Sequence, residues 1–530
     1  MAALAFGVVV RLWMLAHAGL NSDEAIIGLM ADAILRGHFS AFYWGQPYGG
    51  GEPYVVAVMF AVFGHSPYVL NITASLLALI ATVLTWWLGR RVWGTHGPAL
   101  VAAACVWIWP EAVLWNSTRE FGFRGITLIC GLLLLIWAYS LSRRPSTWPI
   151  CLGLGLALGV GWWSSPEILY FAIPALSLLL WAAARRTLHL AAAHAAIVVL
   201  SAVIGATPWI VANVHTHLGS LHAQSQGLLP STYLGRLHIF FAKVLPMSMG
   251  LRIEGAGAWE LGKTATFAIS LGLVLVFVIG VVGVWTKGPN DARFLVGYLA
   301  LFPFLYAVFP QTSFWNDGRY TGFLPPVLAL VVVEGWASLL AGQGSRRNSA
   351  RTVLLAVAAV VIVASTSAST LSAFDRTFPR KGQPTTLEPV GNRVVDLVVD
   401  ALRAHDLDAV VGNYWTAYDV YFVSDRSIAT ATIQTVRLPA LNRQVMNERG
   451  ATWLFVGPTA ADGIAAAAQF GVFSPDPVAM TAAQFRSALT GHGVRYTVAT
   501  IGPMEAITPQ GITGGQLLRR LGLPPPQLAA

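Results

Sequence analysis

The chain has 530 residues, of which 55% are hydrophobic and only 11% charged, and its formal net charge is +9. A soluble globular protein usually carries about 25% charged residues, so this composition excludes a large soluble protein and indicates a polytopic membrane protein. The basic excess does not indicate nucleic-acid binding, because most basic residues stand in short loops between apolar segments. We therefore expect the lipid bilayer, and no nucleic acid, among the partners.

Apolar segments recur along the first 373 residues. A span needs about 20 apolar residues, and on that basis we predict about eleven transmembrane helices. In chain order they are 1–20, 68–89, 97–110, 122–141, 149–163, 168–184, 190–212, 264–285, 294–309, 321–341 and 352–373. Two further segments, 53–64 and 233–249, are predicted as re-entrant or interfacial helices. The first segment lacks a basic start and leads into acids, so we expect no cleavable signal peptide.

Arginine pairs set the predicted orientation. They stand at 90–91, 143–144 and 185–186, and the loop 342–351 carries three more arginines. Placing these loops in the cytoplasm puts the N-terminus inside and everything after about residue 375 outside. The outer loops are then long and the cytoplasmic loops minimal. Because long loops are usually functional, we expect the chemistry on the extracytoplasmic side.

The composition changes after the last predicted span. Residues 408–415, 452–457 and 496–502 are short β-type runs, and helical patterns at 392–405 and 484–493 alternate with them. This alternation predicts a small α/β domain. The chain thus divides into a transmembrane module, 1–373, and an extracytoplasmic α/β domain, 374–530.

The first acids of the chain, Asp23 and Glu24, stand side by side where the first span leaves the membrane. Asn21 and Ser22 are good helix N-caps, and the helix dipole favours acids in the first turn, so a capped amphipathic helix over 23–36 would explain them fully. The other interpretation is catalytic, because a carboxylate at the membrane boundary can accept a proton from a hydroxyl. The residues alone leave both open.

The segment after that helix favours the catalytic interpretation. It reads FYWGQPYGGGEPY, residues 42–54, and combines aromatic rings with three consecutive glycines. Glycines let the backbone turn sharply or approach a ligand closely. An ordinary interfacial loop does not need this mixture. We predict a substrate-binding role for its polar and aromatic side chains, namely Trp44, Gln46, Tyr48 and Glu52.

Together, NSDE after the first span, YGGGE and the later DGRY resemble the GT-C glycosyltransferases. The resemblance covers about residues 1–340 and is greatest to the family 39-like branch, which contains protein O-mannosyltransferases and the aminoarabinose transferase of lipid A. It implies transfer of one sugar from a polyprenyl-phosphate carrier to an acceptor outside the membrane. It also implies that Asp23 is the general base and Glu24 its neighbour, and we predict both as catalytic residues.

Two more outer segments supply candidate side chains. WNSTREFGFRG, residues 115–125, offers Arg119 and Glu120. A solvated Arg–Glu pair would contribute little to stability. In relatives, however, an acid of this loop often completes the site, and we predict Glu120 as this catalytic acid, with Glu111 as its rival. WNDGRYTGF, residues 315–323, can be a simple turn. Yet Arg319 stands where the topology disfavours positive charge, and its two parallel N–H donors suit phosphate.

We therefore predict a single inverting displacement in which Asp23 accepts the acceptor's proton while Arg319 stabilises the leaving polyprenyl phosphate. Arg119 and Tyr320 are predicted to help bind that phosphate, and Tyr320 and Asp317 to orient Arg319. The acceptor can be a glycan, a lipid or a protein. No cofactor and no metal ligands are assigned, and a divalent cation remains possible. The alternative is a transporter or lipid-glycan flippase, although transporters often show repeated halves and we find no repeat.

Overall fold

The computed structural model describes residues 2–17, 20–221, 232–252, 259–260, 262–309, 318–340, 392–457, 477–501 and 504–528. The chain forms two compact units, which are described separately. Unit one comprises Met1–Leu12, Tyr48–Glu52 and Ala74–Ala373, and unit two comprises Trp13–Pro47, Pro53–Thr73 and Phe374–Ala530. Unit two thus joins the segment after the first helix to the C-terminal domain, whereas the sequence predicted a single boundary at 373/374.

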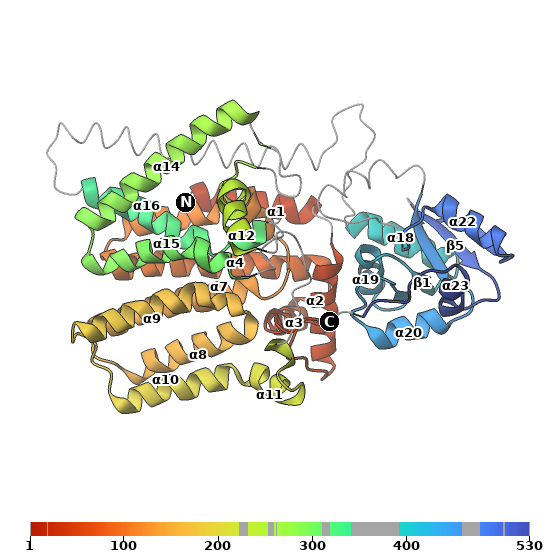
Figure 1. The fold of residues 1–530 in the computed structure, drawn as a ribbon, viewed down its shortest axis with the longest axis horizontal. Coiled ribbons are helices and arrows are strands. Elements are labelled where there is room, and N and C mark those ends of the chain that lie inside the picture. Colours follow the sequence, from red (N-terminus) through yellow and green to blue (C-terminus); the bar gives the residue numbers. More distant parts are fainter. Residues whose placement is uncertain are drawn as a thin grey trace. The chain divides into compact units, whose positions relative to one another are not determined.

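Ten of the eleven predicted spans form helices, and the eleventh, 352–373, lies outside the described residues (Figure 1). The ten correspond to α1 (Ala2–His17), α4 (Pro67–Trp93), α5 (Gly97–Trp107), α7 (Arg124–Arg143), α8 (Trp148–Ser164), α9 (Leu169–Ala184), α10 (Ala192–Gly205) with α11 (Thr207–His215), α14 (Gly262–Thr286), α15 (Arg293–Tyr306) and α16 (Leu324–Leu340). The two weaker apolar segments are helical too. They form α3 (Glu52–Phe63) and the series α12 (Tyr233–Ile239), the π-helix η3 (Phe240–Val244) and α13 (Leu245–Ser248).

Four described helices are long and apolar enough to cross a membrane, and the pair α10 and α11, bent by 57°, makes a fifth candidate. The four are Pro67–Trp93, Arg124–Arg143, Pro166–Ala184 and Gly262–Thr286. Shorter apolar helices accompany them, among them α5, α8 and α16. These lengths and compositions fit an integral membrane protein.

Small residues let the helices of unit one approach closely. Helix α8 packs between α7 and α10, and α14 packs on α16. A Cβ added at Gly159 of α8 would collide with the Ala202 backbone of α10, and one at Gly283 of α14 would collide with the Gly335 backbone of α16. Membrane helices commonly associate through small residues in this way. The close approach of these helix backbones explains why the sequence has several Gly residues inside apolar helices.

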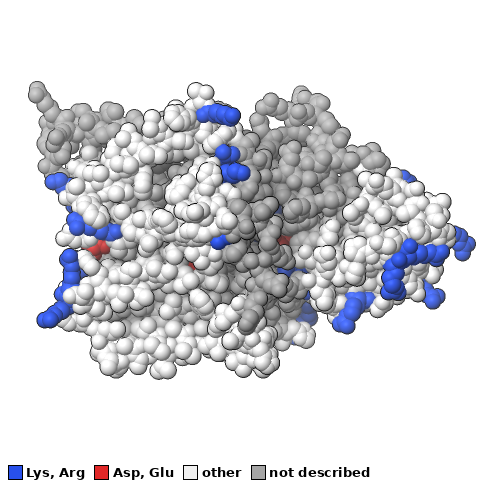
Figure 2. Space-filling model, in the orientation of Figure 1, with Lys and Arg blue, Asp and Glu red and all other residues white. Residues whose placement is uncertain are grey.

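The surface of unit one is apolar where lipid would lie. Over α7 to α10 the view in Figure 2 is almost free of charge, and Lys and Arg gather at one edge. Helix α14 exposes Phe267, Leu271 and Val274. At the end of α7, Arg143 Nη1 lies 2.8 Å from Asp291 Oδ2. The helices of unit one thus have charged ends and uncharged, exposed apolar sides, as expected of membrane helices.

One cation lies inside the first helix of unit one. Arg11 is 3% exposed. Its guanidinium donates to the backbone oxygens of Gly7 and Trp107 at 3.1 and 2.9 Å and to Ser117 Oγ at 3.0 Å, and it stacks on the Trp107 ring. These bonds compensate its burial, so its role is to join α1 to α5.

The C-terminal part of unit two is the predicted α/β domain. Its five-stranded sheet has the order β2-β1-β3-β5-β4. Strand β1 is parallel to β2 and β3, whereas β5 is antiparallel to β3 and β4. The strands are β1 (Ala409–Val411), β2 (Ala429–Ala431), β3 (Thr452–Val456), β4 (Tyr496–Ile501) and β5 (Met504–Pro509), and the helices are α18 (Asn392–Ala404), α19 (Tyr414–Val423), α20 (Pro439–Asn447), α22 (Ala482–Gly491) and α23 (Gly514–Arg520).

Within the same unit, α19 packs against α2 (Ser22–Leu35). Residues of α2, of α3 and of α19 share one apolar core. A Cβ added at Gly28 would overlap the Phe422 ring, so the absent side chain makes room for that ring. The segment that carries Asp23 is therefore held by the C-terminal domain, and the same core positions the candidate base.

Candidate functional site

The predicted cap at the start of α2 is confirmed. Asn21 has extended backbone angles, and its Oδ1 accepts a hydrogen bond from the Glu24 backbone N–H at 3.1 Å. Asp23 and Glu24 occupy the first helical turn, where the dipole favours negative charge. Asp23 remains half-buried while most of the helix behind it is buried. The helix start therefore gives the two acids different surroundings.

The side chain of Asp23 is held by a residue almost four hundred positions later. Tyr414 Oη donates to Asp23 Oδ1 at 2.6 Å. Ser22 Oγ donates to the Tyr414 backbone oxygen, also at 2.6 Å, which joins the first residues of α2 and α19. This bond from a phenol fixes the orientation of one carboxylate oxygen. Asp23 is thus an oriented carboxylate.

The phenol that holds Asp23 is kept protonated. Burial, and then the nearby Asp23 charge, raise the pKa of Tyr414 well above its usual value. The same two influences, together with Tyr414 itself, raise the pKa of Tyr43. The Arg437 guanidinium lies over the Tyr43 ring and donates to the backbone oxygens of Trp44 and Gly45. Arg437 therefore fixes the aromatic loop beside the acid.

Glu24 has a different environment. It is fully buried, and its Oε2 accepts a hydrogen bond from Asn71 Nδ2 at 2.8 Å. Asn71 belongs to the first turns of α4, so this bond ties α2 to α4 inside unit two. These contacts favour a positioning role, and a catalytic role for Glu24 remains a prediction.

Unit one places two other predicted acids side by side. Glu52 and Glu120 are 2% and 1% exposed, and their side chains hydrogen bond to each other. Glu52 Oε1 also accepts from the Ile126 backbone N–H at 2.9 Å, and Glu120 Oε1 accepts from that of Gly122 at 3.2 Å. Burial raises the pKa of Glu52. Because burial disfavours the charged form of both carboxyl groups, we expect the pair to hold one proton between them.

We expect Glu120→Gln to preserve the fold and to weaken the pH dependence of its stability. Because burial raises the pKa of Glu52 above its usual 4.5, the folded chain binds more protons than the unfolded chain between these two values. The free energy of unfolding therefore falls as the pH rises through that window. A glutamine amide donates to Glu52 without losing a proton, so the fall should be smaller.

Thermal unfolding in detergent, followed from about pH 5 to pH 8, measures this effect. Glu120→Leu serves as the contrast, because it leaves Glu52 buried without its partner and should lower stability by about 1–3 kcal/mol. Equal pH dependence in the wild type and in Glu120→Gln would show that the acid pair does not share a proton.

Three guanidinium groups line the pocket that contains this acid pair. Arg119 lies over the Trp115 ring at 4.4 Å and Arg319 over the Phe121 ring at 5.0 Å, while Arg124 lies 4.4 Å from the Tyr320 ring centroid. The cavity measures 110 Å³. Its wall also includes apolar side chains from α4, from α7 and from the segment after Arg319, namely Ala74, Leu77, Ala78, Leu128 and Phe323. Cations and an apolar wall together suit an anionic group attached to a hydrocarbon chain.

The structure thus brings Glu52, Glu120, Arg119 and Arg319 to one pocket of unit one, as residues from the predicted outer loops. Tyr320 is 6% exposed and packs near both Arg124 and Arg319. Asp317, which the sequence suggested as a partner of Arg319, lies outside the described residues. The ring of Tyr48 meets that of Phe123 edge-on at 5.0 Å, so it also belongs to the surroundings of this pocket.

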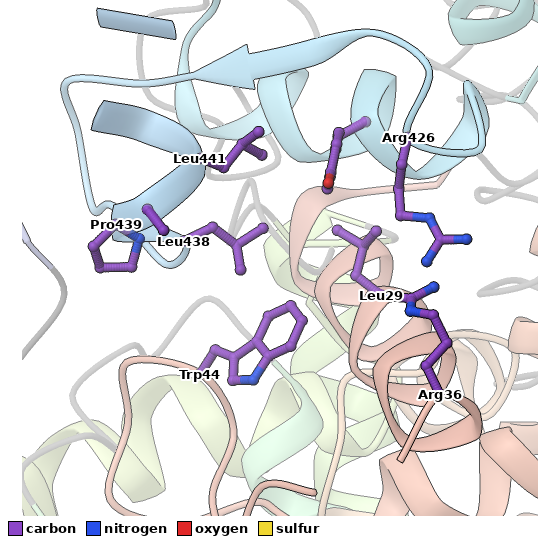
Figure 3. Close-up of a pocket in the computed structure, with 9 residues that line it drawn as sticks. Leu29, Arg36, Trp44, Arg426, Leu438, Pro439 and Leu441 are labelled. Atoms are coloured by element: carbon purple, nitrogen blue, oxygen red, sulfur yellow. The ribbon is translucent and has the colours of Figure 1, made fainter. Parts of the chain in front are cut away.

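A second cavity lies within unit two and contains Trp44. It measures 280 Å³ and is lined by Arg36, Arg426 and a set of apolar residues from α2 and the start of α20. Figure 3 shows the guanidinium groups of Arg36 and Arg426 pointing toward one another, with the Trp44 ring facing Leu438. Gln46 is half-buried in the same aromatic loop, and its backbone N–H donates to the Tyr43 oxygen.

Sequence reasoning did not identify Tyr414 or Arg437 as parts of the site. Tyr414 follows Asn413, whose side chain accepts from the Thr416 N–H and caps α19. The aromatic-rich segment 413–428 fits the entrance for an acceptor and the core of a sheet equally well. The signal that would have separated the two interpretations is this Asn cap, because it predicts a helix start.

Residues 51–211 match the sequence model of the family described as dolichyl-phosphate-mannose-protein mannosyltransferase. The matched segment, which includes Glu52, Arg119 and Glu120, is similar to that family, whereas Asp23 and Arg319 lie outside it.

The solved structures of ArnT share the fold of this chain, a GT-C fold, over almost its whole length. ArnT from Cupriavidus metallidurans in the apo state has a TM-score of 0.59 at 12% identity, over 96% of this chain and 97% of that chain. The same protein bound to undecaprenyl phosphate has a TM-score of 0.56 with the same identity and coverage. The oligosaccharyltransferase AglB from Archaeoglobus fulgidus has a TM-score of 0.45 at 12% identity, over 85% of this chain and 69% of that chain. No curated protein sequence matched.

Proposed function

We propose that the chain transfers a sugar from a polyprenyl-phosphate donor to an acceptor hydroxyl on the extracytoplasmic side. The observation that carries this proposal is the pocket of unit one, where guanidinium groups, a buried acid pair and an apolar wall meet in a GT-C fold. That combination suits a phosphate on a lipid chain. The proposed topology places the N-terminus in the cytoplasm and the C-terminal domain outside.

The donor phosphate is assigned to Arg319 and Arg119. Arginine forms two parallel hydrogen bonds with a phosphate, and fixed donors stabilise the charge that accumulates as the phosphate leaves. Tyr320 packs beside Arg319 and keeps it in place. Structurally similar ArnT has been solved with undecaprenyl phosphate, which supports a lipid phosphate as the leaving group in this chain as well.

Asp23 is assigned as the general base. The acceptor oxygen forms a bond to the anomeric carbon, the bond from that carbon to the phosphate oxygen breaks, and the hydroxyl proton passes to the Asp23 carboxylate. Attack from the face opposite the leaving group inverts the configuration. Tyr414 is a positioning residue, because its hydrogen bond orients the carboxylate. Glu120 is proposed as a second catalytic acid at the sugar, and Glu52 is proposed to bind sugar hydroxyls through its carboxyl oxygens.

The acceptor is assigned to the aromatic loop. Trp44 lines the cavity of unit two, and flat rings of this kind stack on apolar sugar faces. Arg36 and Arg426 in the same cavity favour an acceptor with an anionic group, either a glycan or a lipid headgroup. Gln46 and Tyr48 complete the proposed contacts of the loop.

Incubation of the purified protein in detergent with a panel of polyprenyl-phosphate sugars and a cell-envelope extract tests the function. We expect one donor of the panel to be consumed and its sugar to appear on an envelope component. A transporter would leave every donor chemically intact in detergent and would only move it across a sealed vesicle. Intact donors across the whole panel would therefore contradict the proposed transfer.

A further inference from the structure

A cluster of metal-ligating side chains lies within unit two, apart from the residues discussed above. Asp32 stands near the end of α2, His65 in the turn between α3 and α4, and Asp425 just after α19. One ligand atom from each lies within 4.8 Å of the others. We propose that these three side chains bind a structural zinc ion, which links α2 and the α3–α4 turn to the C-terminal domain.

The separation of the first two ligand atoms fits a shared ion. Asp32 Oδ2 lies 3.2 Å from His65 Nδ1. Zinc binds nitrogen and oxygen ligands at about 2.0–2.2 Å in a tetrahedron, which places two ligand atoms roughly 3.4 Å apart. Asp32 is 7% exposed, and its Oδ2 is buried without a hydrogen-bond partner among the described residues. The imidazole is therefore close to this oxygen without donating to it, as two ligands of one ion would be.

The imidazole ring is fixed by its neighbours. The ring of His65 stacks on Phe422 at 4.5 Å and on Phe60 at 5.1 Å, nearly parallel to both. Both phenylalanines are buried. His65 itself is exposed, so these rings orient the imidazole and leave one side of it open to solvent. The stacking also holds Nδ1 on the side of Asp32.

The third proposed ligand is the side-chain carboxylate of Asp425. Asp425 has a φ of 51°, in the left-handed region that Asp tolerates better than most residues. Its Oδ1 accepts from Arg426 Nη2 at 3.3 Å, an outer-shell bond of the type that orients metal-binding carboxylates. The side chain of Asp425 is 74% exposed, so a water molecule can complete a tetrahedral site from the solvent side.

The proposed site would complete the attachment of two helices that are already joined at their first turns. Tyr414 and Ser22 connect the starts of α19 and α2, Gly28 receives Phe422 in the middle, and the metal would join the far ends. Asp32 is nine residues beyond Asp23, or about 13–14 Å at 1.5 Å per residue. The ion would therefore stabilise the base-bearing helix without contacting the reacting groups.

Zinc content and thermal stability of the full chain test this proposal independently of sugar transfer. The protein in detergent is treated with a chelator, supplied with ZnCl₂, desalted and analysed for zinc by mass spectrometry. We expect the wild type to retain one zinc ion more than His65→Gln or Asp425→Asn, and zinc to raise the Tm of the wild type alone. Asp408→Asn, which removes an exposed carboxylate elsewhere in the same domain, should behave as the wild type.

Asp425 is exposed, so Asp425→Asn keeps the experiment decisive if His65→Gln fails to fold. Equal zinc content in the wild type and in Asp425→Asn would overturn the proposal. So would a Tm that does not respond to zinc, which would show that His65 forms only an ion pair with the two acids. Failure of the proposed sugar transfer would change neither measurement.

Discussion

Arg319→Ala should lower kcat/KM for sugar transfer by about 10²–10³-fold, which is the cost of removing one fixed donor from a developing charge. The guanidinium lies in the pocket of unit one, over the Phe121 ring, and is assigned to the departing phosphate. Arg319→Lys keeps the charge but loses the two parallel N–H groups, so it should recover only part of the rate. Initial rates with the donor identified from the panel measure both variants.

Arg185→Ala is the matched control for this prediction. Arg185 is an exposed arginine just after α9, over the Trp181 ring, and it does not line the pocket. It should transfer sugar at the wild-type rate. If Arg319→Ala were as active as Arg185→Ala, the leaving phosphate would have to be stabilised by other groups, and the assignment of Arg319 would be wrong.

Asp23→Asn should lower kcat by about 10²–10⁴-fold, the usual contribution of a general base. The asparagine oxygen can still accept the hydrogen bond from Tyr414, so the fold should be retained, but the amide cannot take the proton of the acceptor. Asp23→Glu, which moves the carboxylate by one methylene, should keep part of the activity because it keeps the proton acceptor.

Tyr414→Phe separates positioning from proton transfer. It removes the hydroxyl that holds Asp23 and leaves the base in place, so kcat should fall less than in Asp23→Asn, with KM for the donor unchanged. Thermal unfolding of each variant controls for loss of structure. An Asp23→Asn protein that is folded and fully active would remove Asp23 from the mechanism.

Much of the helical architecture could be predicted from the sequence, because an apolar run of fixed length has few alternatives in a bilayer. The helix cap at Asn21 could equally be predicted from the sequence, since it depends on three neighbouring residues. Strands β1, β3 and β4 fell within predicted runs, whereas β2, only three residues long, and β5 were not predicted. Length does not separate the two groups, since β1 is as short as β2 and β5 is as long as β4. Strand formation here depends on packing within the sheet, which a local pattern does not show.

The candidate site was harder to predict from the sequence than the helices, because its contacts join residues that are far apart in the chain. Asp23, Glu120 and Arg319 stood out because charges are rare in this chain, and each lies where a predicted loop leaves the membrane helices. The contacts that position these side chains join residues far apart in the sequence, namely Asp23 with Tyr414 and Glu52 with Glu120. No local pattern encodes such pairs. The same holds for Asp32, His65 and Asp425, which come from three separate elements.

Released polyprenyl phosphate and transferred sugar can be counted together in one detergent reaction with a labelled polyprenyl-phosphate sugar and a cell-envelope extract. We expect the wild-type protein to release polyprenyl phosphate and to transfer sugar in equal amounts, and Asp23→Asn to yield almost neither. The assigned mechanism would be wrong if sugar stayed attached to its lipid phosphate in the presence of the folded wild-type protein, or if Asp23→Asn transferred sugar undiminished.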